Sequence, residues 1–281
     1  MLIPRVAAVH DLSGFGRCSL TVAIPILSAM GVQCCPLPTA FLSTHTGDFE
    51  GYTFLDLTDE MEKAAAHWKS LALKFQSIYS GFLGSEHQIE VVERFIRDFR
   101  GEDTIIVVDP VMGDQGLVYK TYTPAMCEGM KRLAEAADVI TPNLTEAALL
   151  LDIPYDRMPT DEAGLRSVVA QLSLGGRRSV VLTGFSSSPD LTGALCYDAA
   201  NGETSAVQVE RVNREFYGTG DVFSSVLTGA LVKGAALHDA TAHAVSFVLE
   251  CAKLTAKNQL PIREGVDFEP LLGLLTGGVH G

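Results

Sequence analysis

The chain has 281 residues, of which 47% are hydrophobic and 20% charged, and its formal net charge at pH 7 is −13. This length and hydrophobic content can bury a large core, so we expect one domain over residues 1–281, and the negative charge argues against nucleic acid or an anionic membrane as a partner. No apolar run approaches the roughly 20 residues that span a bilayer, and the N-terminus lacks a secretory pattern, so we expect a cytoplasmic protein.

Short β-branched segments alternate with longer amphipathic segments in the first half of the chain, which is typical of βαβ units. Within Thr104–Val108 the apolar residues follow one another without polar alternation, which indicates a strand covered on both faces and a mostly parallel sheet. The predicted strands are Val6–Val9, Val32–Leu37, Ser77–Tyr79 and Thr104–Val108, and the predicted helices are Ser19–Met30, Asp59–Phe75 and Glu86–Phe99.

The second half continues this alternation and then adds an edge to the sheet. Asn201 and Gly202 stand between two alternating runs, which is a strong hairpin signal. We therefore predict an α/β fold with a mostly parallel central sheet flanked by helices and an antiparallel edge hairpin. The predicted strands are Asp138–Ile140, Ser179–Leu182, Gly193–Tyr197 and Thr204–Val209, and the predicted helices are Pro124–Ala136, Leu144–Leu151, Asp161–Leu174, Gly220–Lys233, Leu237–Lys257 and a short one near Phe268–Leu274.

The six cysteines are expected to be reduced. No two of them have the Cys-x-x-Cys spacing of metal and redox motifs, and the adjacent Cys34 and Cys35 would bridge poorly. A structural zinc is the less favoured alternative. The remaining cysteines are Cys18, Cys127, Cys196 and Cys251.

Polar segments follow most of the predicted strands of the parallel sheet. Ligands bind such sheets where strands end and helices begin, so we expect the functional site at this edge. The segments are 11–17, 44–47, 80–85, 109–116, 141–146 and 183–188.

The turn Gly218-Thr219-Gly220-Asp221 precedes an apolar helix and has the pattern of an anion-binding site. Its glycines allow the backbone to come close to an anion, because no Cβ stands in the way. The unpaired N–H groups and the positive dipole end of the helix attract that anion. Asp221 is then placed to accept a proton from an attacking hydroxyl, and the helix dipole is expected to keep it ionised near neutrality. The alternative is a structural loop in which Asp221 is the N-cap.

Two further segments carry carboxylates beyond buried strands. Asp109 and Asp114 flank a loop containing Pro and Gly and could hold a magnesium ion near a phosphate, or belong to an ordinary acidic turn. Asn143 and Glu146 have the spacing of a capping box, and the same side chains also suit phosphate and hydrated-metal contacts.

Other familiar motifs are absent or ambiguous. The segment 14–19 lacks the third glycine of a dinucleotide fingerprint, and the chain has no Walker-type phosphate loop and no Gly-x-Ser-x-Gly elbow. The polar segment 43–47, which includes His45, could bind a small polar ligand or form a loop hydrogen-bond network.

Taken together, these ordered motifs resemble the pyridoxal kinases of the ribokinase-like superfamily. The match runs across most of the chain, and the Ser-Thr-His-Thr and Ser-Gly-Phe-Leu-Gly-Ser segments resemble the vitamin B6 branch in particular. The segments that carry the resemblance are 14–19, 41–47, 80–85, 109–113, 141–146 and 218–221.

The resemblance implies transfer of the γ-phosphate of ATP to the 5′-hydroxymethyl group of pyridoxal, pyridoxine or pyridoxamine. It implies Mg²⁺, allows a monovalent cation such as K⁺, and implies a homodimer. By the resemblance, Asp221 is the base and Gly218, Thr219 and Gly220 form the anion hole. The resemblance also places three groups of residues. At the phosphates lie Asp109, Asn143 and Glu146, of which Asp109 and Glu146 bind the metal, and the nucleotide site is lined by Thr183 and Gly184. The vitamer is surrounded by Asp11, Cys18, Thr46 and Phe82.

One departure from the family is Asp11, where many pyridoxal kinases have serine, and a carboxylate there favours a cationic partner. The nearest alternative is a hydroxymethylpyrimidine or hydroxymethylpyrimidine phosphate kinase, but such relatives tend to place Cys where this chain has Asp221. A sugar kinase is less favoured, because the first third of this chain lacks the glycine-rich sugar-binding segment that such a kinase would carry. A binding protein without catalysis is also less favoured, because it would have lost the base or the anion turn, and this chain has both.

Overall fold

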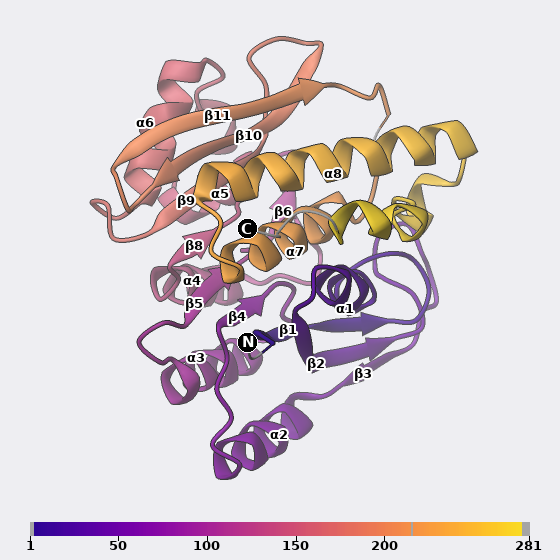
Figure 1. Ribbon diagram of the computed structural model, residues 1–281, viewed down its shortest axis with the longest axis vertical. Helices are drawn as coiled ribbons and strands as arrows, with labels where there is room; N and C mark the ends of the chain where they lie inside the picture. The colour runs from indigo at the N-terminus through magenta and orange to yellow at the C-terminus, as the bar shows by residue number, and fades with distance from the viewer. Residues whose placement is uncertain (1–2, 215, 277–281) are drawn as a thin grey trace.

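A nine-stranded sheet forms the centre of the computed structural model, which describes residues 3–214 and 216–276 (Figure 1). The strand order is β11-β10-β9-β8-β5-β4-β1-β2-β3. The six strands from β9 to β2 in this order run parallel, while β3 at one edge and the β10–β11 hairpin at the other are antiparallel. The strands are β1 (Arg5–Ser13), β2 (Gln33–Leu42), β3 (Phe54–Asp56), β4 (Ser77–Ser80), β5 (Ile105–Val108), β8 (Val139–Ile140), β9 (Ser179–Phe185), β10 (Leu191–Asp198) and β11 (Glu203–Glu210).

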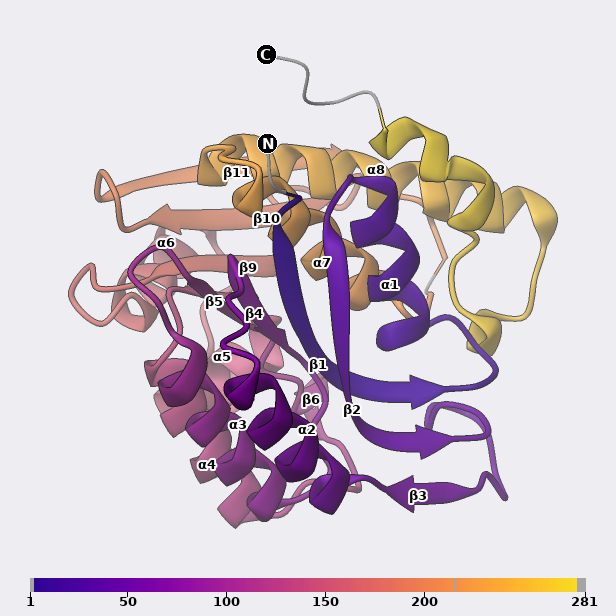
Figure 2. The same cartoon turned by 60° about the horizontal axis from the view of Figure 1, so that its bottom comes forward.

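Helices cover both faces of the sheet, as the apolar strands predict. Alternate residues of one strand enter two different cores: Ala7 and Val9 join the cluster under α2 to α6, and Val6 joins the cluster under α1, α7 and α8 (Figure 2). The helices are α1 (Leu20–Ala29), α2 (Thr58–Ser70), α3 (Glu86–Phe99), α4 (Pro124–Glu135), α5 (Leu144–Leu151), α6 (Glu162–Leu172), α7 (Thr219–Val232) and α8 (Leu237–Asn258), with 3-10 turns η1 (Tyr155–Arg157), η2 (Ile262–Glu264) and η3 (Glu269–Leu275).

The predicted fold class is confirmed, and most of the predicted elements are present. The predicted helix Asp59–Phe75 is too long, because the helix ends at Ser70 and Ala72, with φ 51°, turns the chain toward β4. The short helix predicted near residue 268 is instead the 3-10 segment η3. No helix in the described part of the chain is both long and apolar enough to cross a membrane.

The prediction missed two small elements at the edge where the parallel strands end. One is the exposed strand β3, which pairs with β2. The other is a hairpin of β6 (Gly113–Asp114) and β7 (Leu117–Val118), whose turn residues Gln115 and Gly116 have φ of 51° and 79°. Positive φ at both central residues matches the right-handed twist of strands, so this turn closes tightly although its sequence is not the usual Asn-Gly.

Candidate active site

The glycine turn begins α7 and lies against the loop before α1. Gly218 is the N-cap of α7 with φ 76°, and a Cβ built on it would lie 2.1 Å from the Arg17 carbonyl oxygen. Only glycine fits this position, because other residues rarely adopt a positive φ and because any Cβ would collide with the Arg17 oxygen. The first intrahelical bond runs from the Val222 N–H to the Gly218 oxygen, at 3.1 Å, so the preceding N–H groups of the helix have no partner within it.

Gly220 differs from Gly218 in what surrounds it. It is exposed, and outside its own helix and neighbours no described heavy atom lies within 4 Å of a Cβ built there. The amide end of α7 therefore opens onto unfilled space, where an anion can approach.

Asp221 is the third residue of α7 and not its N-cap, so the structural alternative for this residue is wrong. Burial, with the charge of Asp11, raises the pKa of Asp221 to about 7, although a hydrogen bond from the Ser19 backbone lowers it. At this pKa Asp221 is only partly ionised at neutrality, less than the helix dipole led us to expect, because burial removes hydration from the carboxylate. A pKa near 7 suits a general base.

Asp109 follows β5 and faces the same end of α7. It is buried, and the Ser224 hydroxyl donates to its Oδ2 at 3.2 Å, with the Thr141 hydroxyl 3.0 Å from that of Ser224. Burial, together with the charge of Asp221, raises the pKa of Asp109 to about 7. Because Ser224 lies one turn after Asp221 on the same face of α7, the carboxylates of Asp109 and Asp221 lie near each other at this end of the helix.

Asn143 and Glu146 form the capping box that their spacing predicts. The Asn143 N–H donates to Glu146 Oε2 at 2.8 Å, and the Glu146 N–H donates to Asn143 Oδ1 at 2.9 Å. The other Glu146 oxygen accepts from the Met112 N–H at 3.2 Å, and the Asn143 amide donates to the Gly113 oxygen at 2.8 Å. The pair therefore caps α5 and also holds the loop that follows Asp109.

Glu146 belongs to the acidic group as well as to the cap. It is buried, and burial beside Asp109 raises its pKa well above the usual range. Within residues 3–214 and 216–276, no three His, Cys, Asp or Glu side chains form a complete metal site. Mg²⁺ commonly takes only one or two carboxylates and completes its shell with water and phosphate oxygens, so Asp109 and Glu146 suit it chemically.

Tyr119 and Asp114 reach this group through the unpredicted β6–β7 hairpin. Partial burial and the charges of Glu146, Asp114, Asp109 and Asp221 all raise the pKa of Tyr119, so its phenol stays protonated among acids. Asp114 itself is exposed. The sequence reasoning missed Tyr119, and only its place shortly after the acidic loop could have suggested it.

Asp11 lies within β1, not in a loop after it, because the strand continues to Ser13. Its two carboxylate oxygens accept from the Ser13 hydroxyl at 2.8 Å and the Ser19 hydroxyl at 2.5 Å. Burial and the charges of Asp11 and Asp221 raise the pKa of Cys18 well above its usual value, so this residue is a thiol. The structure therefore brings Asp11, Cys18 and Asp221 together.

Thr46 and Phe82 lie in the segments that follow β2 and β4, the two neighbours of β1 in the sheet. Thr46 is exposed, whereas Phe82 is half-buried and packs edge-on against Tyr122 with centroids 6.2 Å apart. His45 is part of a loop network, because it accepts from the Gly47 N–H at 3.0 Å and its Nε2 lies 2.6 Å from the Arg263 oxygen.

Thr183 and Gly184 lie within β9, which continues to Phe185, and not in a loop after it. Gly184 has φ 74° and sits at a bulge in the pairing with β10. The Thr183 N–H donates to the Pro142 oxygen at 2.9 Å, so these residues adjoin the Asn143 cap. The antiparallel partner β10 extends β9 past the point where its parallel neighbour ends, which the sequence pattern did not indicate.

Each of the six cysteines lies in the described part of the chain and is unpaired, as expected.

A family model described as phosphomethylpyrimidine kinase matches residues 24–267. A pyridoxine/pyridoxal/pyridoxamine kinase of Bordetella avium is 29% identical over 282 residues, which cover 92% of this chain and 89% of that protein.

Two solved structures have nearly the same fold. A Bacteroides thetaiotaomicron protein, provisionally assigned as a phosphomethylpyrimidine kinase and crystallised with pyridoxal, is 43% identical with a TM-score of 0.93, covering 100% of this chain and 98% of that one. Pyridoxal kinase from Lactobacillus plantarum is 32% identical with a TM-score of 0.87, covering 98% and 97% of the two chains.

Proposed function

The chain belongs to the phosphomethylpyrimidine kinase family, and from that premise we propose that it transfers the γ-phosphate of ATP to the 5′-hydroxymethyl group of a B6 vitamer. The relatives named above support pyridoxal, pyridoxine and pyridoxamine as the substrate class. The observation that carries the proposal is the juxtaposition of a half-buried carboxylate, Asp221, with the open amide end of α7.

In the proposed mechanism, Asp221 accepts the proton of the hydroxymethyl group as its oxygen attacks the phosphorus. The amides of Gly218, Thr219 and Gly220 stabilise the negative charge on the moving phosphoryl group. Phosphoryl transfer depends mainly on positioning and charge stabilisation, so a strongly acidic protein can perform it without a cluster of basic side chains.

The acidic group that follows β5 and caps α5 would hold the nucleotide. Asp109 and Glu146 are the proposed magnesium ligands, and bound Mg²⁺ would neutralise phosphate charge. Asn143, Thr183 and Gly184 would line the nucleotide site, and the open space beside Gly184 leaves room for a ligand. K⁺ is a further ion that the proposal allows.

The vitamer would lie on the β1 side, among Asp11, Cys18, Thr46 and Phe82. Because both Asp11 oxygens already accept hydrogen bonds from serine hydroxyls, we propose that the charge of Asp11 acts on a cationic vitamer through its electric field rather than through a direct bond.

We further propose one kinase domain over residues 1–281, a cytoplasmic location and a homodimer. Analytical ultracentrifugation can measure the mass of the dimer.

The rate of the reaction is expected to depend on pH through Asp221. Its ionised form is the base, so kcat/KM for the vitamer should rise with pH and reach a plateau above a midpoint near pH 7. Asp109 titrates in the same range, so the observed midpoint belongs to the interacting pair. Initial rates from pH 5 to 9 measure it, and a kcat/KM that stays constant over this whole range would show that the pKa of Asp221 is not raised in solution.

The substrate class is tested with purified protein and Mg-ATP. Pyridoxal, pyridoxine, pyridoxamine and hydroxymethylpyrimidine are offered separately, and phosphorylated product is quantified by mass spectrometry. We expect product from the B6 vitamers. Product only from the pyrimidine would assign the chain to the second candidate, the activity after which the family model is named, and no product from any alcohol would refute the kinase proposal.

A further inference from the structure

Arg17 lies in the loop between β1 and α1, and its side chain reaches the last described segment of the chain. Its Nε donates to both carboxylate oxygens of Glu269, at 2.7 and 3.0 Å, and its terminal nitrogen lies 2.9 Å from Asp267 Oδ1. The Arg17 side chain is 26% exposed and that of Asp267 only 7%. The guanidinium therefore bridges two acids, one of them buried.

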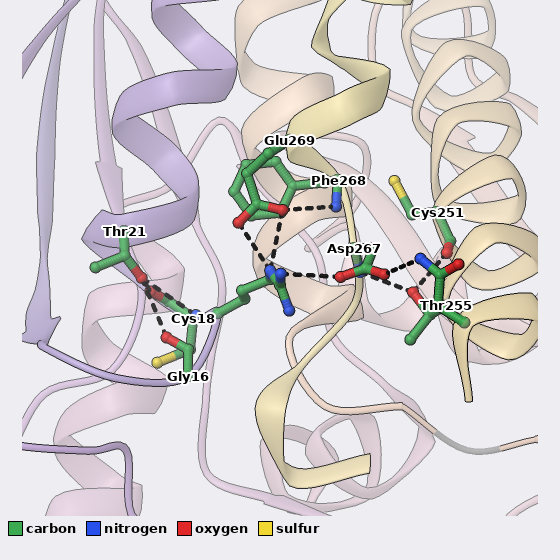
Figure 3. Close-up of polar contacts among 10 residues, drawn as sticks. Gly16, Cys18, Thr21, Cys251, Thr255, Asp267, Phe268 and Glu269 are labelled. Carbon is green, nitrogen blue, oxygen red and sulfur yellow. Dashed lines mark hydrogen bonds and ion pairs between the residues drawn. The ribbon is translucent and has the colours of Figure 1, made fainter. Parts of the chain in front are cut away.

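Asp267 is itself held by α8, so it offers Arg17 a fixed partner. The Asn258 amide donates to Asp267 Oδ2 at 2.7 Å, and the Asp267 N–H donates to the Thr255 hydroxyl at 2.7 Å. Thr255 in turn donates to the Cys251 carbonyl, one turn earlier in α8, at 2.7 Å (Figure 3). The loop before α1 is thus tied through Arg17 to a long helix that packs on the sheet.

The backbone of Arg17 is enclosed by two glycines. A Cβ built on Gly218 would lie 2.1 Å from the Arg17 oxygen, and one built on Gly265 would lie 2.8 Å from both the Arg17 oxygen and its Cβ. The Arg17 N–H also donates to the Glu264 oxygen at 3.1 Å. The same peptide therefore touches the anion turn on one side and the C-terminal segment on the other.

Two residues further on, Ser19 connects this loop to Asp221. Ser19 has φ 51° and ψ −128°, a conformation that a residue with a side chain adopts only when its surroundings hold it there. In this conformation its backbone hydrogen-bonds Asp221, and its hydroxyl donates to Asp11 at 2.5 Å. The hydrogen-bond partner of the proposed base thus belongs to a strained loop that needs external support.

We propose that Arg17 is a positioning residue, whose pairing with Asp267 and Glu269 holds the loop 16–19 against the Gly218 turn and so fixes Asp221 for proton transfer. This inference rests on the proposed function, in which Asp221 is the base. A group that acts only by positioning should affect turnover more than ground-state binding, since small displacements of a reacting group are costly in rate.

The test replaces Arg17 with methionine, which retains much of the side-chain volume without the charge. We expect kcat to fall about 10- to 100-fold while KM for ATP and for the vitamer changes by less than about 3-fold. Arg17→Lys, which can still pair with one acid, should recover part of the loss. Arg100→Met is the matched control, because Arg100 pairs with Asp138 at the amino end of β8, whereas the proposed site lies at the carboxyl ends of the parallel strands. It should leave kcat unchanged at a similar loss of Tm.

A milder variant, Glu269→Gln, keeps the inference testable if Arg17→Met does not fold, because Glu269 is 49% exposed. It should lower kcat by about 3-fold or more with unchanged KM, and combining it with Arg17→Met should add little further loss. A folded Arg17→Met protein with wild-type kcat, or a loss of kcat no larger than in Arg100→Met, would overturn the positioning role alone. Wild-type protein inactive on every alcohol would overturn the proposed function and this role with it.

Discussion

Replacement of Asp221 by asparagine is expected to lower kcat for phosphoryl transfer by about 10²- to 10⁴-fold, the usual contribution of a general base. An amide has the shape of the carboxylate but cannot accept the proton of the attacking hydroxyl. ATP binding should largely persist, because the amides of the α7 turn and the Asp109 carboxylate remain in place. Product formation measures the first effect, and calorimetric titration with Mg-ATP measures the second.

The stability of the same variant provides its folding control. Burial raises the folded-state pKa of Asp221 from 3.8 to about 7, so the native protein holds this proton more tightly than the unfolded chain does. The stabilising effect of that proton is complete below pH 4 and is lost as the pH rises through 7. Asparagine does not ionise, so the Tm of Asp221→Asn minus that of the wild type should increase between pH 5 and pH 8. A folded, ATP-binding variant with near-wild-type turnover would remove Asp221 from the mechanism.

Replacement of Gly218 by alanine is expected to reduce turnover by at least about 100-fold, the effect of losing one oxyanion donor, and also to lower Tm. The residue has φ 76°, and its new methyl group would meet the Arg17 carbonyl oxygen at 2.1 Å. Because that oxygen belongs to the backbone, the turn itself must move, and the amides that face the proposed phosphoryl site move with it.

Two alanine variants separate strain from loss of the anion site. Gly31 has nearly the same φ, 77°, but no described atom within 4 Å of its built Cβ, so Gly31→Ala should show only the conformational penalty, about 1 to 2 kcal/mol, with normal turnover. Gly220→Ala should keep its stability and lose turnover, because its methyl group enters the open space at the end of α7. Normal turnover in Gly220→Ala and Gly218→Ala would show that phosphate does not bind at this turn.

The central sheet could be predicted because its strands bury both faces. The sequences of residues 104–108 and 179–182 do not alternate between apolar and polar side chains, which indicates that neither face of these strands is exposed. In the structure helices cover both faces, as expected. The capping box of Asn143 and Glu146 was also predictable, because it depends only on a three-residue spacing and local hydrogen bonds. The strand β3 was not, because its three residues are all exposed and are ordered only by pairing with β2.

Some residues of the candidate site could likewise be placed from the sequence, and others could not. The position of Asp109 at the end of a parallel strand could be predicted from the sequence pattern, whereas its place in one site with Asp221 and the glycine turn was implied only by the family resemblance. The sequence pattern did not predict that Thr183 and Gly184 lie inside β9, because the extension of that strand depends on its antiparallel partner β10.

By itself, the sequence determined the fold class, the family and the kinds of chemical group at the site, because these follow from local periodicity and short motifs. Only the tertiary structure decided the pKa of Asp221, the approach of Tyr119 to the acidic group and the link from Arg17 to Asp267 and Glu269. Each of these depends on burial or on contact between residues that are far apart in the chain. Hydration and charge–charge interactions are set by distance in space, which spacing along the sequence does not specify.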